Sequence, residues 1–277
     1  MSDIFAAIPT LGSGLGYRRQ IRQGILAARD EIDFLEIITD EYINNPAYAR
    51  HLESVCDIFP VITHGVGLSI GSATPPDRQY LRAIKRLSDL TRSPYYSEHL
   101  CMTQAPGLDI GHLSPIWFTE EMLTTTIRRV NQVQDFLEKP LVLENVTYMM
   151  AIPHNSMSQT EFFNRLVEAT GCGILLDVTN IYINSVNHHF DAAAFLRAMP
   201  LPHVIQVHIA GGSWRDGLLI DTHSRPVQEE SWQLLELLTN LAKVRGIILE
   251  HDARFPKMDV LLTQVKRARM LQENSEL

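Results

Sequence analysis

The sequence is dominated by eight short apolar runs, rich in β-branched residues, that alternate with helix-like stretches. A strand buried on both faces is apolar along its whole length, and strands separated by helices are typical of a parallel sheet. The runs cover residues 11–16, 32–38, 59–64, 94–100, 140–145, 172–178, 203–209 and 246–251. Eight such units in 277 residues predict an α/β fold, a single (β/α)8 TIM barrel.

Helical patterns fill the spaces between these runs. They cover residues 80–90, 120–137, 159–170, 190–199 and 229–244. Proline or glycine stands where a helix gives way to the next strand, at Pro94, Pro140, Gly171 and Gly246. With 45% hydrophobic and 20% charged residues, the chain can bury a large core, and no linker or shift in composition interrupts it. We therefore expect one domain over residues 1–277.

Side chains that bind divalent cations stand near the end of nearly every predicted strand. They are Glu36, His64, Glu98, His99, Glu144, Asp177, His208 and Glu250. In a parallel barrel all strand ends of one polarity meet on one face, where barrel enzymes place their active sites. Buried carboxylates around one axis repel each other, so bound cations would stabilise the arrangement. The joint pattern predicts a shared metal centre, although for Glu36 and Glu98 a structural role is an equal alternative.

Two further segments supply candidate ligands. Asp221 and His223 are two residues apart, so in an extended segment both project to the same side. Asn180 follows Asp177 by three positions and offers a neutral amide oxygen. The full predicted ligand set is His64, His99, Glu144, Asp177, Asn180, His208, Asp221, His223 and Glu250. This set suffices for two or three ions, and imidazole with carboxylate suits iron, zinc or manganese.

Other features argue against several classes of protein. The net charge of −8 disfavours a nucleic-acid partner. Cys56, Cys101 and Cys172 are widely spaced and form no CxxC motif, so neither a disulfide framework nor a thiolate zinc site is expected. The N-terminus lacks a signal-peptide pattern, and no apolar run approaches the roughly 20 residues of a membrane span. We expect a soluble, cytoplasmic protein with no membrane partner.

We expect different roles for the two glycine-rich segments of the sequence. Residues 11–16 (LGSGLG) lack the full GxGxxG pattern with a ribose-binding acid, so a dinucleotide site is not expected. Residues 65–72 (GVGLSIGS) follow the third predicted strand. They could bind an anion through backbone N–H groups, or let the backbone pass close to the metals.

Several motifs together resemble one enzyme family. They include HGVGLSIGS at 64–72, LVLENV at 141–146, LLDVTN at 175–180 and LLIDTHSRPV at 218–227. These motifs are similar to those of the multinuclear non-heme iron-dependent oxidative enzymes, over about residues 12–255. The resemblance implies a barrel of the xylose-isomerase-like type, with iron ligands at the nine predicted positions. The sequence departs from the family pattern in TDEYI (39–43) and at Thr179, neither of which includes a proposed ligand.

The resemblance also implies a function. Family members modify a cysteine residue of a ribosomally synthesised precursor peptide, with O2 as co-substrate, and commonly work with a small partner protein that presents the peptide. One subgroup excises the β-carbon of a C-terminal cysteine on the way to a thia-amino acid. The cofactor would be two or three iron ions in a mixed Fe(II)/Fe(III) state.

By the same resemblance, Glu144 would bridge two irons and would form the catalytic core with Asp177 and His208. The other ligands would divide among three positions. His64 and His99 would hold one iron, Asp177, His208 and Glu250 a second, and Asn180, Asp221 and His223 a third.

Three other functions remain open on the residues alone. A zinc-dependent abasic-site endonuclease also places such ligands on barrel strand ends, but Asn180 stands where a histidine would be expected, and the net charge disfavours DNA. A sugar isomerase would need a lysine or histidine for proton or hydride transfer, and no predicted strand ends in lysine. A non-catalytic metal-binding scaffold would keep the ligands but close the site.

Overall fold

The computed structural model describes residues 5–274, and its centre is a closed barrel of eight parallel strands. In chain order the barrel strands are β1 (Gly12–Gly16), β2 (Leu35–Ile38), β3 (Val61–Gly65), β4 (Tyr96–His99), β7 (Leu141–Glu144), β8 (Gly173–Asp177), β9 (Val204–Ile209) and β12 (Gly246–Leu249). β1 closes the barrel by pairing with β12 on one side and with β2 on the other. All eight predicted strands and the TIM-barrel prediction are confirmed.

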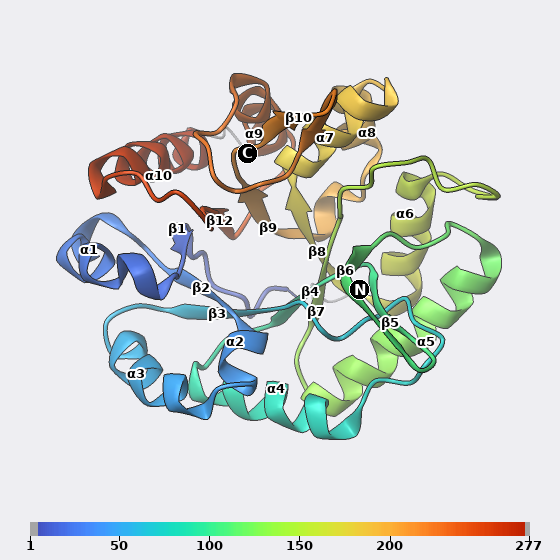
Figure 1. Cartoon of the computed structure of the whole chain (residues 1–277), viewed down its shortest axis with the longest axis horizontal. Coiled ribbons are helices and arrows are strands. Elements are labelled where there is room, and N and C mark those ends of the chain that lie inside the picture. The colour runs from blue at the N-terminus through green and yellow to red at the C-terminus, as the bar shows by residue number, and fades with distance from the viewer. Residues whose placement is uncertain (1–4, 275–277) are drawn as a thin grey trace.

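Helices surround these strands, as Figure 1 shows. They are α1 (Arg22–Ala27), α2 (Thr39–Ile43), α3 (Pro46–Cys56), α4 (Arg78–Leu90), α5 (Glu120–Leu137), α6 (Gln159–Thr170), α7 (Val178–His188), α8 (Ala192–Ala198), α9 (Glu229–Leu241) and α10 (Met258–Glu273), with short 3-10 turns at Arg19–Ile21, Arg29–Glu31 and Leu201–His203. Local signals set the ends of α5 and α6, which match the predicted ranges. The Thr119 and Ser158 hydroxyls accept hydrogen bonds from the first turns, and Gly171 ends α6 with a φ of 64°.

The barrel interior has two layers of different chemistry. A cluster of buried apolar side chains includes Phe34, directly before β2, with Ile62 of β3 and Val142 of β7. Two residues further along the same strands come Glu36, His64 and Glu144. Side chains at i and i+2 of a strand share a face, so these polar groups lie directly above the apolar layer. The packed layer closes the barrel below the C-terminal strand ends and leaves one open end for chemistry.

Two hairpins outside the barrel were not predicted. β5 (Met102–Ala105) pairs with β6 (Leu108–Ser114) after β4, and β10 (Ser213–Arg215) pairs with β11 (Leu218–Ile220) after β9. Both belong to loops that leave the C-terminal ends of barrel strands, so both stand at the end of the barrel that carries the polar layer. Within residues 5–274, no helix combines the length and the apolar character that a bilayer crossing requires.

Candidate metal centre

The predicted ligands converge at the C-terminal end of the barrel. Eight of them, joined by Glu36, have ligand atoms in four overlapping groups, each within 4.8 Å. The groups are Glu36–His64–His208, His64–His99–Glu144, Glu144–Asp177–His208–Glu250 and Asp177–Asp221–His223. The last three groups match the three sets of ligands implied by the family resemblance, except that the third group contains Asp177 and lacks Asn180. Shared members, Glu144 and Asp177, link each group to the next.

The first of these three groups places two imidazoles on one carboxylate oxygen. Nε2 of His64 and Nε2 of His99 each lie 3.2 Å from Glu144 Oε2. That buried oxygen nevertheless accepts no hydrogen bond from any described residue. Two ligands about 2.1 Å from one ion are separated by roughly 3 Å, so this spacing without hydrogen-bond geometry fits shared coordination.

The central group surrounds His208. Its Nδ1 lies 3.1 Å from Glu144 Oε1 and 3.1 Å from Glu250 Oε2. Asp177 caps α7 through Oδ1, which accepts from the backbone N–H of Asn180 at 2.8 Å. The other oxygen, Oδ2, is buried and without a hydrogen-bond partner among the described residues. Glu144 therefore directs its two oxygens into two neighbouring groups, as a bridging carboxylate would.

The third group lies nearest to solvent. Nε2 of His223 is 2.8 Å from Asp221 Oδ1, and within the described chain neither atom makes a hydrogen bond. Asn180 adds a buried amide oxygen that also has no hydrogen-bond partner in the described chain. The amide nitrogen of Asn180, Nδ2, donates to the backbone oxygen of Asn145 at 3.0 Å, and this hydrogen bond fixes the orientation of the amide. Buried polar atoms normally have partners, so these unpartnered ligand atoms suit a bound cation.

Hydrogen bonds to the protein orient three of the imidazoles. Nδ1 of His64 lies 3.0 Å from the Ser97 hydroxyl, and Nδ1 of His99 lies 2.9 Å from the backbone oxygen of Gly65. Nδ1 of His223 lies 2.9 Å from Asp252 Oδ2. In each ring Nε2 is thereby turned towards the cluster, as expected for metal-binding histidines.

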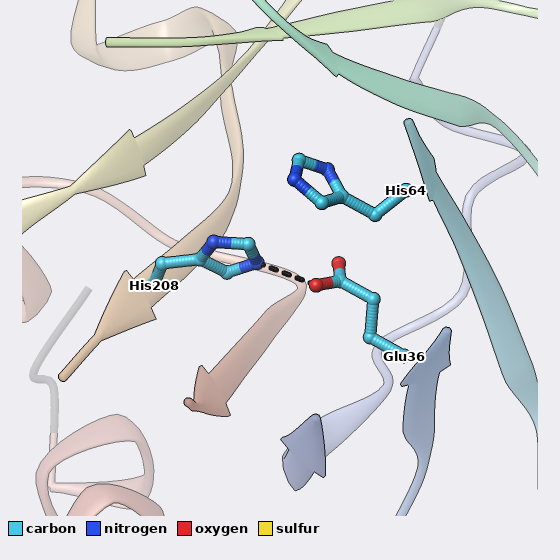
Figure 2. A group of neighbouring side chains, drawn as sticks. All are labelled: Glu36, His64 and His208. Atoms are coloured by element: carbon cyan, nitrogen blue, oxygen red, sulfur yellow. Dashed lines mark ion pairs between the residues drawn. The ribbon is translucent and has the colours of Figure 1, made fainter. Parts of the chain in front are cut away.

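For two glutamates, Glu36 and Glu98, the sequence did not decide between a metal ligand and a structural role, and the structure gives them different surroundings. Glu98 belongs to none of the four groups, and its carboxylate accepts from the backbone N–H groups of His99 (2.9 Å) and Leu68 (3.1 Å), which is a structural role. Glu36 belongs to one group, and Figure 2 shows it pointing from β2 towards His208. Its Oε1 lies 2.8 Å from His208 Nε2.

The charges in this centre are poorly balanced without a cation. Burial raises the pKa of Asp177 well above its ordinary value, and the nearby Asp221 and Glu144 carboxylates raise it further. Burial lowers the pKa of His64 well below its ordinary value, and His99 adds to that effect. A bound cation would favour the ionised carboxylate and the neutral imidazole together.

The glycine-rich segment at 65–72 packs against the centre and is not available to anions along most of its length. Its N–H groups at Val66, Leu68, Gly71 and Ser72 are already bonded within the protein. At Gly65, a Cβ would lie 1.7 Å from the Tyr96 hydroxyl. The structure therefore favours the second expectation, a close passage of the backbone beside the cluster.

The sequence reasoning missed several supporting residues. Ser97 and Asp252 each lie two positions from a predicted ligand, His99 and Glu250, and that spacing could have suggested them. Arg18 carried no such signal. Its Nε donates to Asp252 at 2.7 Å, and its guanidinium lies 4.0 Å from Glu250, so it places a positive charge beside the carboxylates.

Comparison with known proteins identifies relatives along almost the whole chain. The sequence model of one family, described as "RiPP precursor modification enzyme MbnB/TglH/ChrH", matches residues 12–273. A protein of Shewanella sediminis, named UPF0276 protein, is 37% identical over 255 residues, which cover 91% of each chain. A protein of the same name from Caulobacter vibrioides is 35% identical over 263 residues, which cover 94% of each chain.

Solved structures with the same fold have quite different sequences. Endonuclease IV from Thermus thermophilus superposes with a TM-score of 0.58 at 14% identity, over 94% of this chain and 98% of that one. A xylose isomerase domain protein from Planctomyces limnophilus superposes with a TM-score of 0.56 at 12% identity, over 90% and 92%. These likenesses concern the fold alone and confirm the xylose-isomerase-like type of barrel.

Proposed function

Since this chain belongs to the family of RiPP precursor modification enzymes, we propose that it oxidises a cysteine residue of a ribosomally synthesised peptide. The cofactor is proposed to be two or three iron ions in a mixed Fe(II)/Fe(III) state, with O2 as co-substrate. The product of one such reaction would be a thia-amino acid precursor from which the cysteine β-carbon has been excised. A family of peptide-modifying enzymes supports the substrate class, and the ligand types support the metal.

One observation carries the proposal: three overlapping ligand groups, each of which contains at least one buried ligand atom without a hydrogen-bond partner in the described chain. We assign His64, His99 and Glu144 to one ion, and Glu144, Asp177, His208 and Glu250 to a second. Asp221, His223 and Asn180 would hold a third with the help of Asp177. Iron bound in such a centre supplies one-electron redox chemistry and holds a thiol as its thiolate.

The protein's own part in the reaction is to hold these groups in place and to limit the access of water. Glu144 joins two ligand groups through its two oxygens, and Asp177 is held at both backbone atoms by the Asn145 side chain, each at 2.9 Å. His208 lies at the centre with no exposed surface. We propose Glu144, Asp177 and His208 as the catalytic core on this basis.

The surroundings of the open barrel end support a peptide and a partner protein. Met149 and Met150, in the loop after β7, are 69% and 76% exposed, and Trp214 in the hairpin after β9 is 64% exposed. Large apolar side chains in such exposed positions mark surfaces that bind other chains. We propose that the precursor peptide, presented by a small partner protein, docks over these loops.

The alternative functions have weaker support. The neighbours that include endonuclease IV and a xylose isomerase domain protein share the fold, and fold alone does not transfer an activity. The net charge of −8 also disfavours a DNA substrate, because the DNA backbone is negatively charged. A non-catalytic scaffold would keep the same ligands but close the site, whereas the side chains of Asp221 and His223 are 19% and 16% exposed.

The test is turnover with defined peptides. Short synthetic peptides with one cysteine, each paired with a serine counterpart, are incubated with the iron-loaded enzyme with and without O2 and analysed by mass spectrometry. We expect an oxygen-dependent mass change in cysteine peptides only, and its loss in Asp177→Ala and His208→Ala variants. Unchanged metal content and unchanged peptide oxidation in both variants would overturn the assignment of roles.

A further inference from the structure

A cavity of about 230 Å³ lies at the rim of the barrel, outside the three proposed ligand sets. One wall starts at Tyr17, directly after β1, and the other is formed by α2 and α3, which follow β2. Figure 1 shows α1 and α3 as neighbours around the barrel. Both walls leave C-terminal strand ends, so the cavity shares the end of the barrel that carries the candidate metal centre.

The lining of this cavity is basic and aromatic. It includes three tyrosines, two arginines and one histidine: Tyr17, Tyr42, Tyr48, Arg19, Arg22 and His51. None of the described residues that line it is acidic. On a chain of net charge −8 this is a local excess of positive charge, which attracts an anionic group.

The two arginines of the cavity are not neutralised by the protein. Among the described residues, neither Arg19 nor Arg22 forms an ion pair, whereas Arg18 between them turns away and pairs with Asp252. The guanidinium of Arg19 lies 3.7 Å from the centre of the Tyr48 ring, which supports it from one side. Nε of Arg22 is buried and has no hydrogen-bond partner in the described chain. Guanidinium groups in this state suit a carboxylate, which accepts two N–H donors at once.

Two tyrosines add neutral hydrogen-bond donors. Burial raises the pKa of Tyr17 and Tyr42 above the ordinary value, so both hydroxyls keep their protons at neutral pH. The Tyr17 hydroxyl is hydrogen-bonded to the Arg22 guanidinium, which can only donate, so the O–H of Tyr17 remains free to donate to a ligand. The rings of Tyr42 and Tyr48 meet edge to face, 6.4 Å apart, and give the cavity an apolar side. A carboxylate on a short apolar stem fits this combination.

We infer that this cavity binds a carboxylate of the peptide substrate at a distance from the reacting cysteine. The inference rests on the proposed function and names how the peptide is recognised. The backbone N–H of Tyr17 donates to the backbone oxygen of Glu36 at 2.6 Å, so the cavity adjoins the metal centre. In the strand order of the barrel, β1 lies opposite β7, whose following loop carries the exposed Met149 and Met150. A peptide that reaches from those methionines to the cavity would cross the metal centre.

Binding of fluorescent peptides that contain serine in place of cysteine tests the cavity without turnover. One peptide carries glutamates on both sides of the serine, a second carries glutamines at the same positions, and each is made with a free and an amidated C-terminus. Fluorescence anisotropy with the iron-loaded protein gives the Kd. We expect Arg19→Gln to raise the Kd of the acidic peptide roughly 10- to 100-fold, because a charge-assisted contact is lost. If amidation, and not the change to glutamine, removes this difference, the carboxylate is that of the C-terminus.

Two further variants guard against a general effect of charge or folding. Arg29→Gln removes the same charge at the 3-10 turn after α1, outside the cavity, where the side chain is 65% exposed, and should leave the Kd unchanged. Arg19→Glu should reverse the preference, so that a peptide with lysines in place of the glutamates binds more tightly than the acidic one. Such a reversal requires a folded protein.

The outcomes separate this inference from the function on which it rests. Equal changes in Arg19→Gln and Arg29→Gln, or one Kd for all four peptides, would overturn it. Binding of inorganic phosphate that depends on Arg19, without peptide binding that depends on Arg19, would identify a site for free anions and would also overturn it. Peptide binding that depends on Arg19, with no oxidation of the matching cysteine peptide, would refute the oxidase and leave the cavity as a peptide site.

Discussion

The stability of the metal-free protein should fall as the pH rises from 6.5 to 8.5. Burial lowers the pKa of His99, but the Glu144 and Glu98 carboxylates outweigh it and raise this pKa to about 9. The ordinary value of 6.5 applies in the unfolded chain. A group whose pKa is raised on folding adds stability below its unfolded pKa and loses it as the pH rises through its folded pKa. For His99 alone the loss between pH 6.5 and pH 8.5 is about 2 kcal/mol.

Two of the neighbouring histidines, His208 and His223, reinforce this trend, whereas His64, whose pKa is lowered by burial, opposes it. In His208 and His223 burial opposes protonation, but carboxylates outweigh it and raise the pKa of both well above the ordinary value. Bound metal should reverse the trend, because ions compete with protons for the same nitrogens and bind more tightly as the pH rises. The stabilisation by metal should therefore increase over this pH range.

Urea unfolding followed by circular dichroism, at pH 6.5, 7.5 and 8.5, measures both effects. The protein is compared with and without metal, and the His99→Gln variant should show a shallower pH dependence when metal-free. His112→Gln, at an exposed histidine of the β5–β6 hairpin, serves as the control and should behave like the parent. Metal-free stability that is constant or rises from pH 6.5 to 8.5 would refute the electrostatic reasoning.

Three other substitutions test the residues that hold the candidate metal ligands in place. Gly65→Ala should destabilise the protein by roughly 1–3 kcal/mol in chemical denaturation, because its Cβ would lie 1.7 Å from the Tyr96 hydroxyl; a change below 0.5 kcal/mol would contradict the packing. Asn145→Ala removes both side-chain hydrogen bonds to the Asp177 backbone, so it should lower the free energy of unfolding by about 1–3 kcal/mol and also lower the metal content. Unchanged stability and metal content would show that Asp177 is held by other means. Ser97→Ala removes the partner of His64 Nδ1 and should lower metal affinity roughly 10-fold in chelator competition, whereas equal affinity would refute its orienting role.

Most of the fold could be predicted because a local sequence pattern specifies each of its main elements. Barrel strands are continuous apolar runs, so all eight could be located from the sequence. The missed helix α7 begins directly at Val178, with Asp177 acting as both strand end and helix cap, so no loop separates the two patterns. The β5–β6 hairpin was missed because it is largely exposed and has no apolar alternation of its own.

The candidate site was predictable in part for the same reason. Strand ends fix which residues share one end of the barrel, so the ligand candidates could be named from spacing alone. The sequence could not show which imidazole nitrogen faces inward, because that depends on partners far along the chain, such as Asp252 for His223, 29 residues away. For the same reason the contact between Glu36 and His208 became visible only in the folded barrel.

Metal analysis of protein purified without oxygen tests the central claim most directly. Elemental analysis is combined with Mössbauer spectroscopy of protein produced with iron-57. Our account predicts two or three irons per chain, part ferrous and part ferric. Tightly bound zinc in place of iron, or no metal at all, would contradict the proposed oxidase and would favour a hydrolase, an isomerase or a non-catalytic barrel.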